Sequence, residues 1–510
     1  MKILSAEQIR AADRYTIEHE PIASIDLMER AAASCTKWLL SAGRSPLYSR
    51  RKVGGEVLVF CGTGNNGGDG LAIARMLIKK NIPVHVFIIS PGNKPVKDFL
   101  QNKKRIAKVS PKSIQEIDSV KQLPRIDKND IVIDALFGTG LSRKPEGFVA
   151  KTIDYINKSK AKVIAVDMPS GLFADEHTSH TSVISATHTL SFQVPKLAFM
   201  FPENAKYAGD WHVLDIGLDK KFIESIPSKY IFTEKKIISA LFPERKKFSH
   251  KGNYGHALIA AGSYGMMGAA VLCTKAALHS GAGLVTAFIP KCGYTIMQRS
   301  VPEAMAVVAS AEKYVCGPLP EKKFTSAAIG PGLGNAKETM RWLNNYLQEI
   351  KVPLLLDADA LNIIAENKLL PKNIPANTIL TPHQGEFTRL AGKAKNDFEK
   401  FEMLKSFSKK YNAIVALKGA HTCIAAPNGE AYFNGTGNPG MAKGGSGDVL
   451  SGITCALLAR GLSPLNACIA GVYLHGLAGD IAAEKFSMET MTASDIISSL
   501  PEAFKQLQKI

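Results

Sequence analysis

Two asparagines and one aspartate lie between glycines in CGTGNNGGDG (61–70). This segment follows an apolar run and precedes the helical pattern LAIARMLIKK. Gly62, Gly64 and Gly67 match GxGxxG, but the next apolar run ends Ile89-Ser90-Pro91, without the acidic residue that holds a ribose in the dinucleotide fingerprint. Asn amides and loop carbonyls suit a monovalent cation or a sugar hydroxyl, and a helix N-terminus suits a phosphate. The polar side chains between the glycines favour a ligand site over a purely structural turn.

Two aspartates end neighbouring apolar runs, and we expect them at the same sheet edge as this loop. Asp134 ends IVID and Asp167 ends VIAVD. One buried aspartate often caps a loop, but two beside an Asn-rich loop indicate a site. The apolar Ala135-Leu136-Phe137 offers Asp134 few local partners, so Asp134 is assigned to a bound cation together with Ser170. Pro169 stiffens the turn that directs Asp167 toward the cleft, where it is the expected acid/base.

A second glycine-rich segment, NPGMAKGGSGDVLSG (438–452), overlaps the start of the helical pattern VLSGITCALLARG. Successive glycines leave backbone N–H groups free at a helix N-terminus, which makes an anion hole for a phosphoryl group in transfer. Asp448 follows at once, where it could take the proton of a hydroxyl that attacks the phosphoryl group. We interpret Lys443 as an additional phosphate contact. The GGxGD junction of loop and helix resembles that of the ribokinase-like kinases.

Composition favours a globular protein with an anionic partner. The 510 residues are 45% hydrophobic and 21% charged, which is ordinary for a soluble protein of two or three domains. The net charge of +18 favours nucleic acid, a membrane surface or a phosphorylated small molecule. The basic residues are scattered and lack interleaved aromatics, which argues against nucleic acid. The eight cysteines form no CxxC pair, which favours buried thiols in a reducing compartment.

The first residues, MKILSAEQIRAADRY, lack the apolar core of a signal peptide. Ser5 to Gln8 fits a capping box that opens an amphipathic helix. No uninterrupted apolar run has the length of a bilayer span, since the Ala-rich segment near Ala269 is broken by Lys275 and several glycines. We therefore expect a cytoplasmic protein with neither a membrane nor a nucleic-acid partner.

Short β-rich runs alternate with helical patterns, which predicts parallel α/β architecture with strands buried on both faces. From Gly217 to His250 the chain turns basic and loses strand pattern, so the domain boundary is placed near Ile226, between 1–225 and 226–510. The expected strands are 57–60, 84–89, 131–137, 163–167, 187–192 and 211–216 in the first half, and 256–261, 284–289, 327–330, 353–357, 378–381, 413–417 and 421–426 in the second.

GNNGGDG, DALFGTG and DMPSG, in this order, resemble the NAD(P)H-hydrate epimerase family over Met1–Lys220. The resemblance implies a Rossmann-like three-layer α/β/α sandwich with a potassium ion on Asn66, Asp134 and Ser170, and with Asp167 as substrate contact and acid/base. It implies that the hydrated cofactor is held by Asn65, Asn66, Gly67, Gly68, Asp69, Gly138, Thr139, Gly140, Leu141, Ser142, Arg143 and Lys144. Epimerisation needs cleavage and re-closure of a C–O or C–N bond at the hydrated ring carbon, and proton transfer by a carboxylate can assist either route.

Five segments of the second half occur in the order found in ADP- or ATP-dependent NAD(P)H-hydrate dehydratases, and the resemblance covers Thr233–Leu507. The segments are HKGNYGHALIAAGSYGMMGAA (250–270), IGPGLG (329–334), DADALN (357–362), LTPHQGEFTRL (380–390) and LKGAHTCIA (417–425). The resemblance implies a ribokinase-like α/β domain. In it Ala269, Gly332, His383 and Asp448 touch the hydrate, and Lys418, Gly419, Ala420, His421, Thr422 and Gly447 hold the nucleotide.

The same resemblance implies a two-step dehydration. Asp448 activates the ring hydroxyl of the S hydrate, the terminal phosphate of ADP or ATP is transferred to it, and the phosphate then leaves, driven by the ring nitrogen lone pair. Glu386 either orders a magnesium-bound water or is simply a carboxylate at a helix start. Potassium, magnesium and a homo-oligomeric state are implied as well.

The alternative is a ribokinase-like small-molecule kinase fused to a non-catalytic nucleotide-binding module. It shares GGSGD and nucleotide use, but it leaves HKGNYG, TPHQGE and the first half unexplained. Asp167, together with Asn66 and Asp134, argues against a non-catalytic first half. The sequence leaves open the choices between NADH and NADPH hydrate, between ADP and ATP, and between the two epimerisation routes.

Overall fold

The computed structural model describes residues 1–41, 55–90, 94–242, 245–319, 323–367 and 374–508. The chain forms two compact units: Met1–Ser228 with Asn396–Phe398, and Lys229–Lys395 with Glu399–Ile510. The first unit therefore continues two residues beyond the boundary that the sequence places near Ile226.

The first unit contains a seven-stranded parallel sheet in the order β3-β2-β1-β4-β5-β6-β7. Its strands are β1 (Val57–Cys61), β2 (Val84–Ile89), β3 (Ile114–Ile117), β4 (Ile131–Ala135), β5 (Lys162–Val166), β6 (His188–Phe192) and β7 (Asp210–Leu214). The order reverses between β1 and β4, which pair with Phe60 beside Asp134. Doubly wound sheets bind ligands at such a reversal, beyond the carboxyl ends of the strands.

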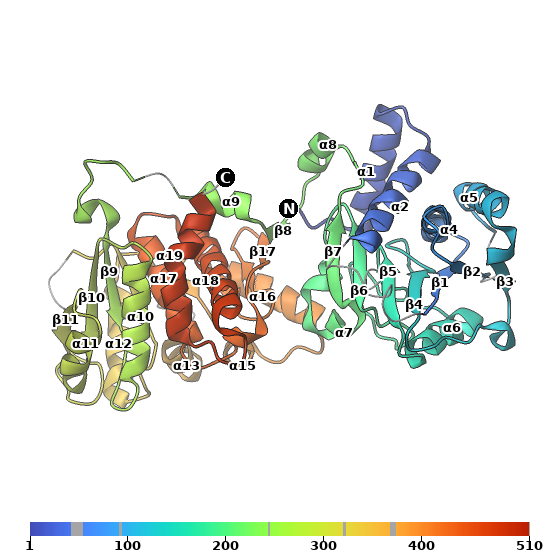
Figure 1. Ribbon diagram of the computed structural model, residues 1–510. Helices are drawn as coiled ribbons and strands as arrows, with labels where there is room; N and C mark the ends of the chain where they lie inside the picture. Colours follow the sequence, from blue (N-terminus) through green and yellow to red (C-terminus); the bar gives the residue numbers. More distant parts are fainter. Residues whose placement is uncertain (42–54, 91–93, 243–244, 320–322, 368–373, 509–510) are drawn as a thin grey trace. The chain divides into compact units, whose positions relative to one another are not determined.

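Alternate apolar side chains of β1 point to opposite faces of the sheet and pack into two separate cores. The sheet therefore lies between two layers of helices (Figure 1). Val57, Val59 and Cys61 pack with α1, α2, α4 and α5, whereas Leu58 and Phe60 pack with α6. The helices are α1 (Ala6–His19), α2 (Ser24–Leu40), α4 (Asn65–Ile78), α5 (Lys97–Val109), α6 (Gly147–Lys158), α7 (Ala205–Ala208) and α8 (Lys220–Ser225). The expected capping box of Ser5 and Gln8 opens α1.

The second unit contains a ten-stranded sheet in the order β11-β10-β9-β12-β13-β14-β15-β16-β17-β8. Among the described strands of this sheet, only the β15–β16 and β16–β17 pairs are antiparallel. The strands are β8 (Tyr230–Thr233), β9 (His256–Ala260), β10 (Leu284–Ile289), β11 (Met305–Val308), β12 (Ser326–Ile329), β13 (Leu354–Leu356), β14 (Ile379–Leu380), β15 (Ile414–Leu417), β16 (Cys423–Ala425) and β17 (Ala431–Asn434). β8 pairs with β17, so the prediction of no strand between Gly217 and His250 is wrong.

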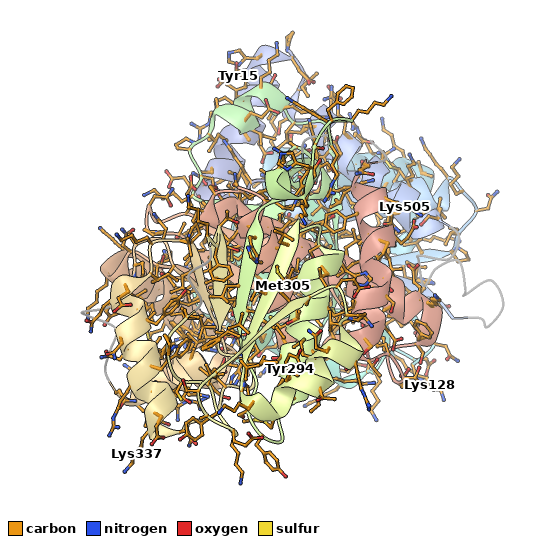
Figure 2. The ribbon with its side chains drawn as sticks, turned by 90° about the vertical axis from the view of Figure 1, so that its left-hand side faces the viewer. Tyr15, Lys128, Tyr294, Met305, Lys337 and Lys505 are labelled. Carbon is orange, nitrogen blue, oxygen red and sulfur yellow. The ribbon has the colours of Figure 1, made fainter. Side chains whose placement is uncertain are left out.

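Helices cover both faces of this sheet, and Figure 2 shows Lys337 of α12 and Lys505 of α19 on either side of the β11 edge. One apolar core joins α10, α17, α18 and α19 to one sheet face. The helices include α9 (Lys235–Ser239), α10 (Met267–His279), α11 (Tyr294–Ser300), α12 (Lys337–Glu349), α13 (Asp359–Glu366), α15 (Gln384–Ala391), α16 (Asp397–Tyr411), α17 (Ser446–Ala459), α18 (Pro464–Phe486) and α19 (Ala493–Gln508).

Within the described ranges, α18 is the one helix with the length and apolar composition to cross a membrane, and 67% of its most apolar window is buried inside the protein. Its sequence does not stand out as a membrane span because His475 and Asp480 interrupt the apolar run. The core helix of a globular domain has the same length and composition.

Candidate active sites

A cavity of about 400 Å³ lies at the carboxyl ends of β1, β4, β5 and β6 in the first unit. Asn65 and Asp69 of α4 reach it, together with Thr139 after β4 and Asp167 after β5. The predicted Asn-Gly loop is thus the first turn of a helix, because α4 begins at Asn65 and not near Leu71 as the helical pattern suggested. The topology brings the three predicted segments to one cleft.

Asp167 is constrained in this cleft by its backbone conformation and by the contacts of its carboxylate. Its φ is +64°, a left-handed conformation that non-glycine residues adopt rarely and often at functional sites. Its carboxylate accepts from the N–H groups of Thr139 at 3.1 Å and Phe192 at 3.3 Å. The ammonium of Lys196 lies 2.8 Å away. Burial alone would raise the pKa of Asp167, but the Lys196 charge and these hydrogen bonds hold it below its usual value.

Lys196 is fully buried, and it is a functional residue that the sequence motifs did not indicate. Besides the Asp167 carboxylate, its ammonium donates to the carbonyls of Phe192 at 2.9 Å and Val194 at 3.3 Å. A buried lysine needs such partners to remain charged. The detectable signal was a single lysine inside the otherwise apolar run VPKLAFM.

Asp134 has more local partners than the sequence suggested, which corrects that prediction. Its carboxylate accepts from the Ser170 hydroxyl at 2.6 Å, the Ser170 N–H at 2.8 Å and the Leu136 N–H at 3.2 Å. The turn after β5 folds back and places Ser170 against β4. Burial nevertheless raises the pKa of Asp134 to about 6, and no ion pair to it occurs among the residues that the structure describes.

Asn66 and Gly138 meet beside Asp167. A Cβ on Gly138 would lie 3.1 Å from the Asp167 carboxylate and 3.4 Å from the Asn66 amide oxygen. The Asn66 amide nitrogen is buried without a hydrogen-bond partner, which is costly unless a bound group supplies one.

The other predicted hydrate contacts lie in the first turn of α4 and in the loop after β4, and their surroundings differ. A Cβ on Gly67 would lie 1.8 Å from the Gly62 carbonyl oxygen, so the backbone excludes a side chain there. One on Gly68 would lie 2.7 Å from the Met28 sulfur, so the end of the Met28 side chain would have to shift. The loop after β4 turns through a Leu141 N–H bond to the Gly138 carbonyl at 3.3 Å. Gly140 has open space around it, and Ser142, Arg143 and Lys144 are exposed.

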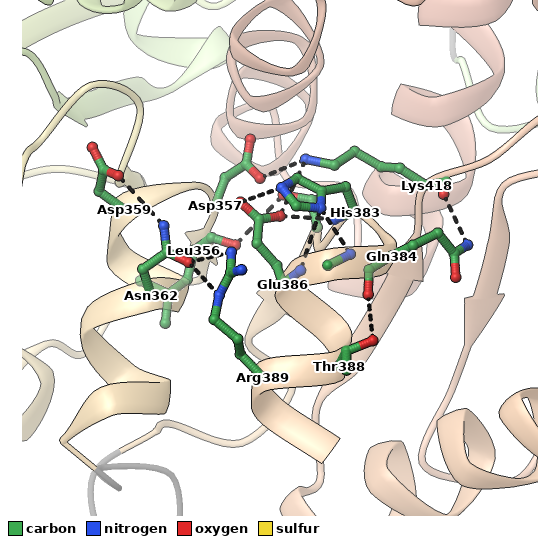
Figure 3. A network of polar contacts seen from close by, with 12 residues as sticks. Leu356, Asp357, Asp359, Asn362, His383, Gln384, Glu386, Thr388, Arg389 and Lys418 are labelled. Carbon is green, nitrogen blue, oxygen red and sulfur yellow. Dashed lines mark hydrogen bonds and ion pairs between the residues drawn. The ribbon is translucent and has the colours of Figure 1, made fainter. Parts of the chain in front are cut away.

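The second unit has its polar centre where Asp357, directly after β13, meets Lys418, directly after β15 (Figure 3). The buried Asp357 carboxylate accepts from the Lys418 ammonium at 2.9 Å and from the Ser451 hydroxyl at 2.7 Å. Glu386 lies 3.9 Å from the same ammonium. Burial lowers the pKa of Lys418, but the Asp357 and Glu386 charges outweigh this effect and raise it.

His383 and Glu386 form a capping box at the start of α15 (Figure 3). The Glu386 carboxylate accepts from the His383 N–H at 2.8 Å, and the His383 Nδ1 accepts from the Gly385 N–H at 3.0 Å. Glu386 was interpreted either as a residue that orders a magnesium-bound water or as a carboxylate at a helix start. Its capping contact is that of a helix-start carboxylate. The second nitrogen of the half-exposed His383 ring lies 3.4 Å from Glu386.

The glycine-rich loop brings Asp448 to this centre. Gly445 caps α17 with a φ of +89°, and Asp448 lies in the first turn. A Cβ on Gly447 would lie 3.5 Å from the Lys418 ammonium and 3.7 Å from the Asp357 carboxylate. Burial, and then the charge of Asp357, raises the pKa of Asp448 to about 6, while Lys418 opposes them. This value suits a general base near neutral pH.

The other predicted hydrate contacts and the predicted nucleotide contacts of this half lie in two separate places. A Cβ on Gly332 would lie 2.9 Å from the Ala269 Cβ, so these two positions adjoin. The turn between β15 and β16 holds Gly419, Ala420, His421 and Thr422, and the Thr422 hydroxyl donates to the Gly419 carbonyl at 3.1 Å. Lys443 was predicted wrongly as a phosphate contact, because its ammonium donates to the carbonyls of Glu489 and Met491.

Comparisons with known proteins cover both halves. A family described as NAD(P)H-hydrate dehydratase matches residues 257–502, and one described as YjeF-related protein N-terminus matches residues 24–198. A bifunctional NAD(P)H-hydrate repair enzyme of Moorella thermoacetica is 36% identical over 100% of this chain and 98% of its own length. One of Thermofilum pendens is 35% identical, over 100% and 97%. The chain belongs to the bifunctional NAD(P)H-hydrate repair enzymes.

A solved structure extends the similarity to the fold of the second half. A ribokinase-like superfamily protein of Enterococcus faecalis is 26% identical, with a TM-score of 0.50, and covers 56% of this chain and 99% of its own. The prediction of a ribokinase-like α/β domain in this repair enzyme is confirmed. The Asp357–Lys418 pair had escaped the sequence analysis because 61 residues separate its members.

Proposed function

We propose that this chain repairs hydrated NADH and NADPH with two separate sites. The first unit interconverts the R and S hydrates, and the second removes water from the S hydrate at the expense of ADP or ATP. Full-length similarity to bifunctional repair enzymes is the observation that carries the proposal. Each unit also has an aspartate and a lysine in contact at the carboxyl ends of its strands, and in the first unit this pair borders a cavity.

Asp167 is the proposed acid/base of epimerisation. Lys196 keeps its carboxylate ionised although the group is buried, so it can accept a proton near neutral pH. Asn65 and Asp69 of α4 and Thr139 after β4 line the cleft, and together with Asn66 and residues 140–144 they are the proposed contacts of the hydrate. Arg143 and Lys144, which are exposed, suit the anionic pyrophosphate.

A potassium ion fits the residues proposed for it. Asp134 is a buried carboxylate without an ion-pair partner in the described ranges, and a monovalent cation would balance its charge. Asn66 and Ser170 add amide and hydroxyl oxygens, which hard cations prefer. When bound, the ion would hold the first turn of α4, which contains Asn66, against the turn after β5, which contains Ser170. Asp167 would carry the proton.

Asp448 is the proposed base of dehydration. It takes the proton from the ring hydroxyl of the S hydrate as that oxygen attacks the terminal phosphorus of ADP or ATP, and the bond to the bridging oxygen breaks to release AMP or ADP. The N–H groups of the GGSG segment face the transferred phosphoryl group. The ring nitrogen lone pair then expels phosphate, and loss of a proton from the neighbouring ring carbon restores the dihydronicotinamide. A phosphate leaves more readily than hydroxide, which explains why water removal consumes a nucleotide.

The nucleotide is placed on Lys418 to Thr422 and Gly447, beside the hydrate contacts Ala269, Gly332 and His383. Among the described residues, no group of three or more His, Cys, Asp and Glu side chains could hold a metal ion. We therefore propose that magnesium enters with the nucleotide phosphates, since it usually keeps several waters and binds few protein ligands.

Restoration of dihydronicotinamide absorbance from purified S hydrate tests the proposal. The full chain should restore it with ADP or ATP and magnesium, and should leave it unchanged without nucleotide. Failure with both nucleotides would favour the alternative, a ribokinase-like kinase acting on another hydroxyl compound. The eight free cysteines support a reducing compartment such as the cytoplasm as the site of action.

A further inference from the structure

Asp13 is a carboxyl group of the epimerase cleft to which neither the family motifs nor the reaction described above gives a role. It lies in α1, is half-buried, and lines the same cavity of about 400 Å³ as Asp167. The Ser5–Gln8 capping box anchors the start of α1, and the Thr16 hydroxyl near its end accepts from the Asp219 N–H at 3.0 Å. The helix therefore holds Asp13 firmly at the wall of the cleft.

The Asp13 carboxyl has no hydrogen bond or ion pair within the described part of the chain, although two arginines share its helix. The charged groups that line the cleft with it are Arg10, Arg14 and Glu18 of α1, Asp69 of α4 and Asp167 after β5, and Lys196 pairs with Asp167. A structural aspartate normally caps a helix, pairs with a cation or accepts backbone N–H groups. Asp13 does none of these and faces the cavity.

Asp13 and Asp167 have opposite electrostatic environments. Burial and the neighbouring Asp167 charge raise the pKa of Asp13 to about 6, against the opposing effect of Lys196. Lys196 and the backbone hydrogen bonds hold the pKa of Asp167 below its usual value. Two carboxyl groups whose environments separate their pKa values divide naturally into an acid and a base.

We propose that Asp13 is the second catalytic residue of the epimerase site and protonates the departing hydroxyl of the hydrate, while Asp167 deprotonates the entering water. The inference rests on the proposed epimerase activity and assigns its route as C–O cleavage. It also gives the two carboxyl groups different tasks in the same cavity.

The step balances without a co-reactant. The ring nitrogen lone pair forms a C=N bond as the C–O bond breaks, and the Asp13 carboxyl gives its proton to the leaving oxygen, which departs as water. A water molecule adds to the other face of the cationic ring, and the Asp167 carboxylate takes its proton. The hydroxyl is restored with inverted configuration. Proton exchange with solvent returns Asp13 to the acid form and Asp167 to the base form.

Interconversion of purified R and S hydrates by the full chain, without nucleotide and followed by chromatography, tests the assignment. Asp13→Asn should lower kcat by about 10²- to 10⁴-fold and leave hydrate affinity unchanged. Asp13→Glu should recover part of the rate. Glu7→Gln, which changes an exposed acid of the same helix, should behave as wild type. In ¹⁸O-labelled water, each epimer formed should carry one solvent oxygen.

Three results would overturn the inference. They are a wild-type rate for Asp13→Asn, a loss of hydrate affinity that accounts for the loss of rate, and epimers that retain the original oxygen. Unchanged hydrate affinity also shows that the variant site is folded. If the wild-type chain itself does not interconvert the hydrates, the proposed epimerase function fails, and the result is distinct from a failure of Asp13 alone.

Discussion

At the residue scale, both sites depend on a lysine that neutralises a buried aspartate. Lys196 lies 2.8 Å from Asp167, and Lys418 lies 2.9 Å from Asp357. In the first site the aspartate itself is the proposed base. In the second, the pair lies beside the proposed base Asp448 and acts on its pKa in opposite directions, because Asp357 raises it and Lys418 lowers it.

Replacing Lys196 with Met should impair epimerisation and shift its pH dependence. Without the ammonium, burial dominates and the pKa of Asp167 rises, so the base form is reached only at higher pH. Leaving a buried carboxylate unpaired should also cost about 3–5 kcal/mol of stability. Rate profiles against pH and thermal unfolding measure both effects, with the exposed Lys151→Met as control. An unchanged pH profile would refute the role of Lys196.

Asp134→Asn should weaken potassium dependence, whereas Asp167→Asn should stop epimer exchange with the hydrate still bound. The Asp134 carboxylate is buried and bonded to Ser170, so its loss removes the charge that attracts the cation. A potassium titration of exchange, with choline chloride holding the ionic strength constant, separates the variants. If Asp134→Asn instead stopped exchange with the hydrate still bound, and Asp167→Asn weakened potassium dependence, Asp134 would be the acid/base and Asp167 the cation ligand.

Dehydration should decline as the pH falls through about 6, the pKa to which burial and Asp357 raise Asp448. The base must be ionised, so the rate should fall about tenfold per pH unit below that value and level off above it. Asp448→Asn should abolish dehydration and leave epimerisation intact. Epimerisation by Asp448→Asn at one fixed pH is the control for folding, and dehydration by Asp448→Asn at the wild-type rate would exclude this base.

At the element scale, burial explains many but not all of the strands that the sequence reveals, since the partly exposed edge strand β7 was predicted and the largely buried β17 was not. β1, β4 and β12 are buried along their whole length, so they read as continuous apolar runs and were predicted. β3, β8 and β11 end their sheets and are partly exposed, so they lack that pattern and were missed. The strand-end aspartates were predictable from motifs, but Lys196 and the partners of Asp134 follow from tertiary folding.

The edge strand β8 should contribute to the stability of the second unit. A fragment beginning at Glu234 lacks β8 and exposes the edge of β17, whereas one beginning at Lys229 retains it. We expect the shorter fragment to melt at lower temperature, by roughly 2–4 °C for each 1 kcal/mol lost, and to aggregate more readily. Calorimetry and light scattering compare them, and identical behaviour would show that β8 is dispensable.

At the scale of the whole molecule, each unit has its own sheet, its own apolar packing and its own aspartate–lysine pair at the carboxyl ends of its strands. Among the described residues, the proposed catalytic and binding residues of each activity belong to a single unit. The two activities should therefore be separable, and their combination in one chain is expected to matter for the R hydrate, which must be epimerised before it can be dehydrated.

Recovery of NADH from purified R hydrate is the most direct test of the central claim. The full chain with ADP or ATP and magnesium should restore the dihydronicotinamide absorbance completely. Asp167→Asn and Asp448→Asn should each fail to do so faster than spontaneous epimerisation allows, and a mixture of the two variants should recover most of the rate. Rapid recovery by either variant alone, or no recovery by the wild-type chain, would contradict the assignment of two sites with two separate activities.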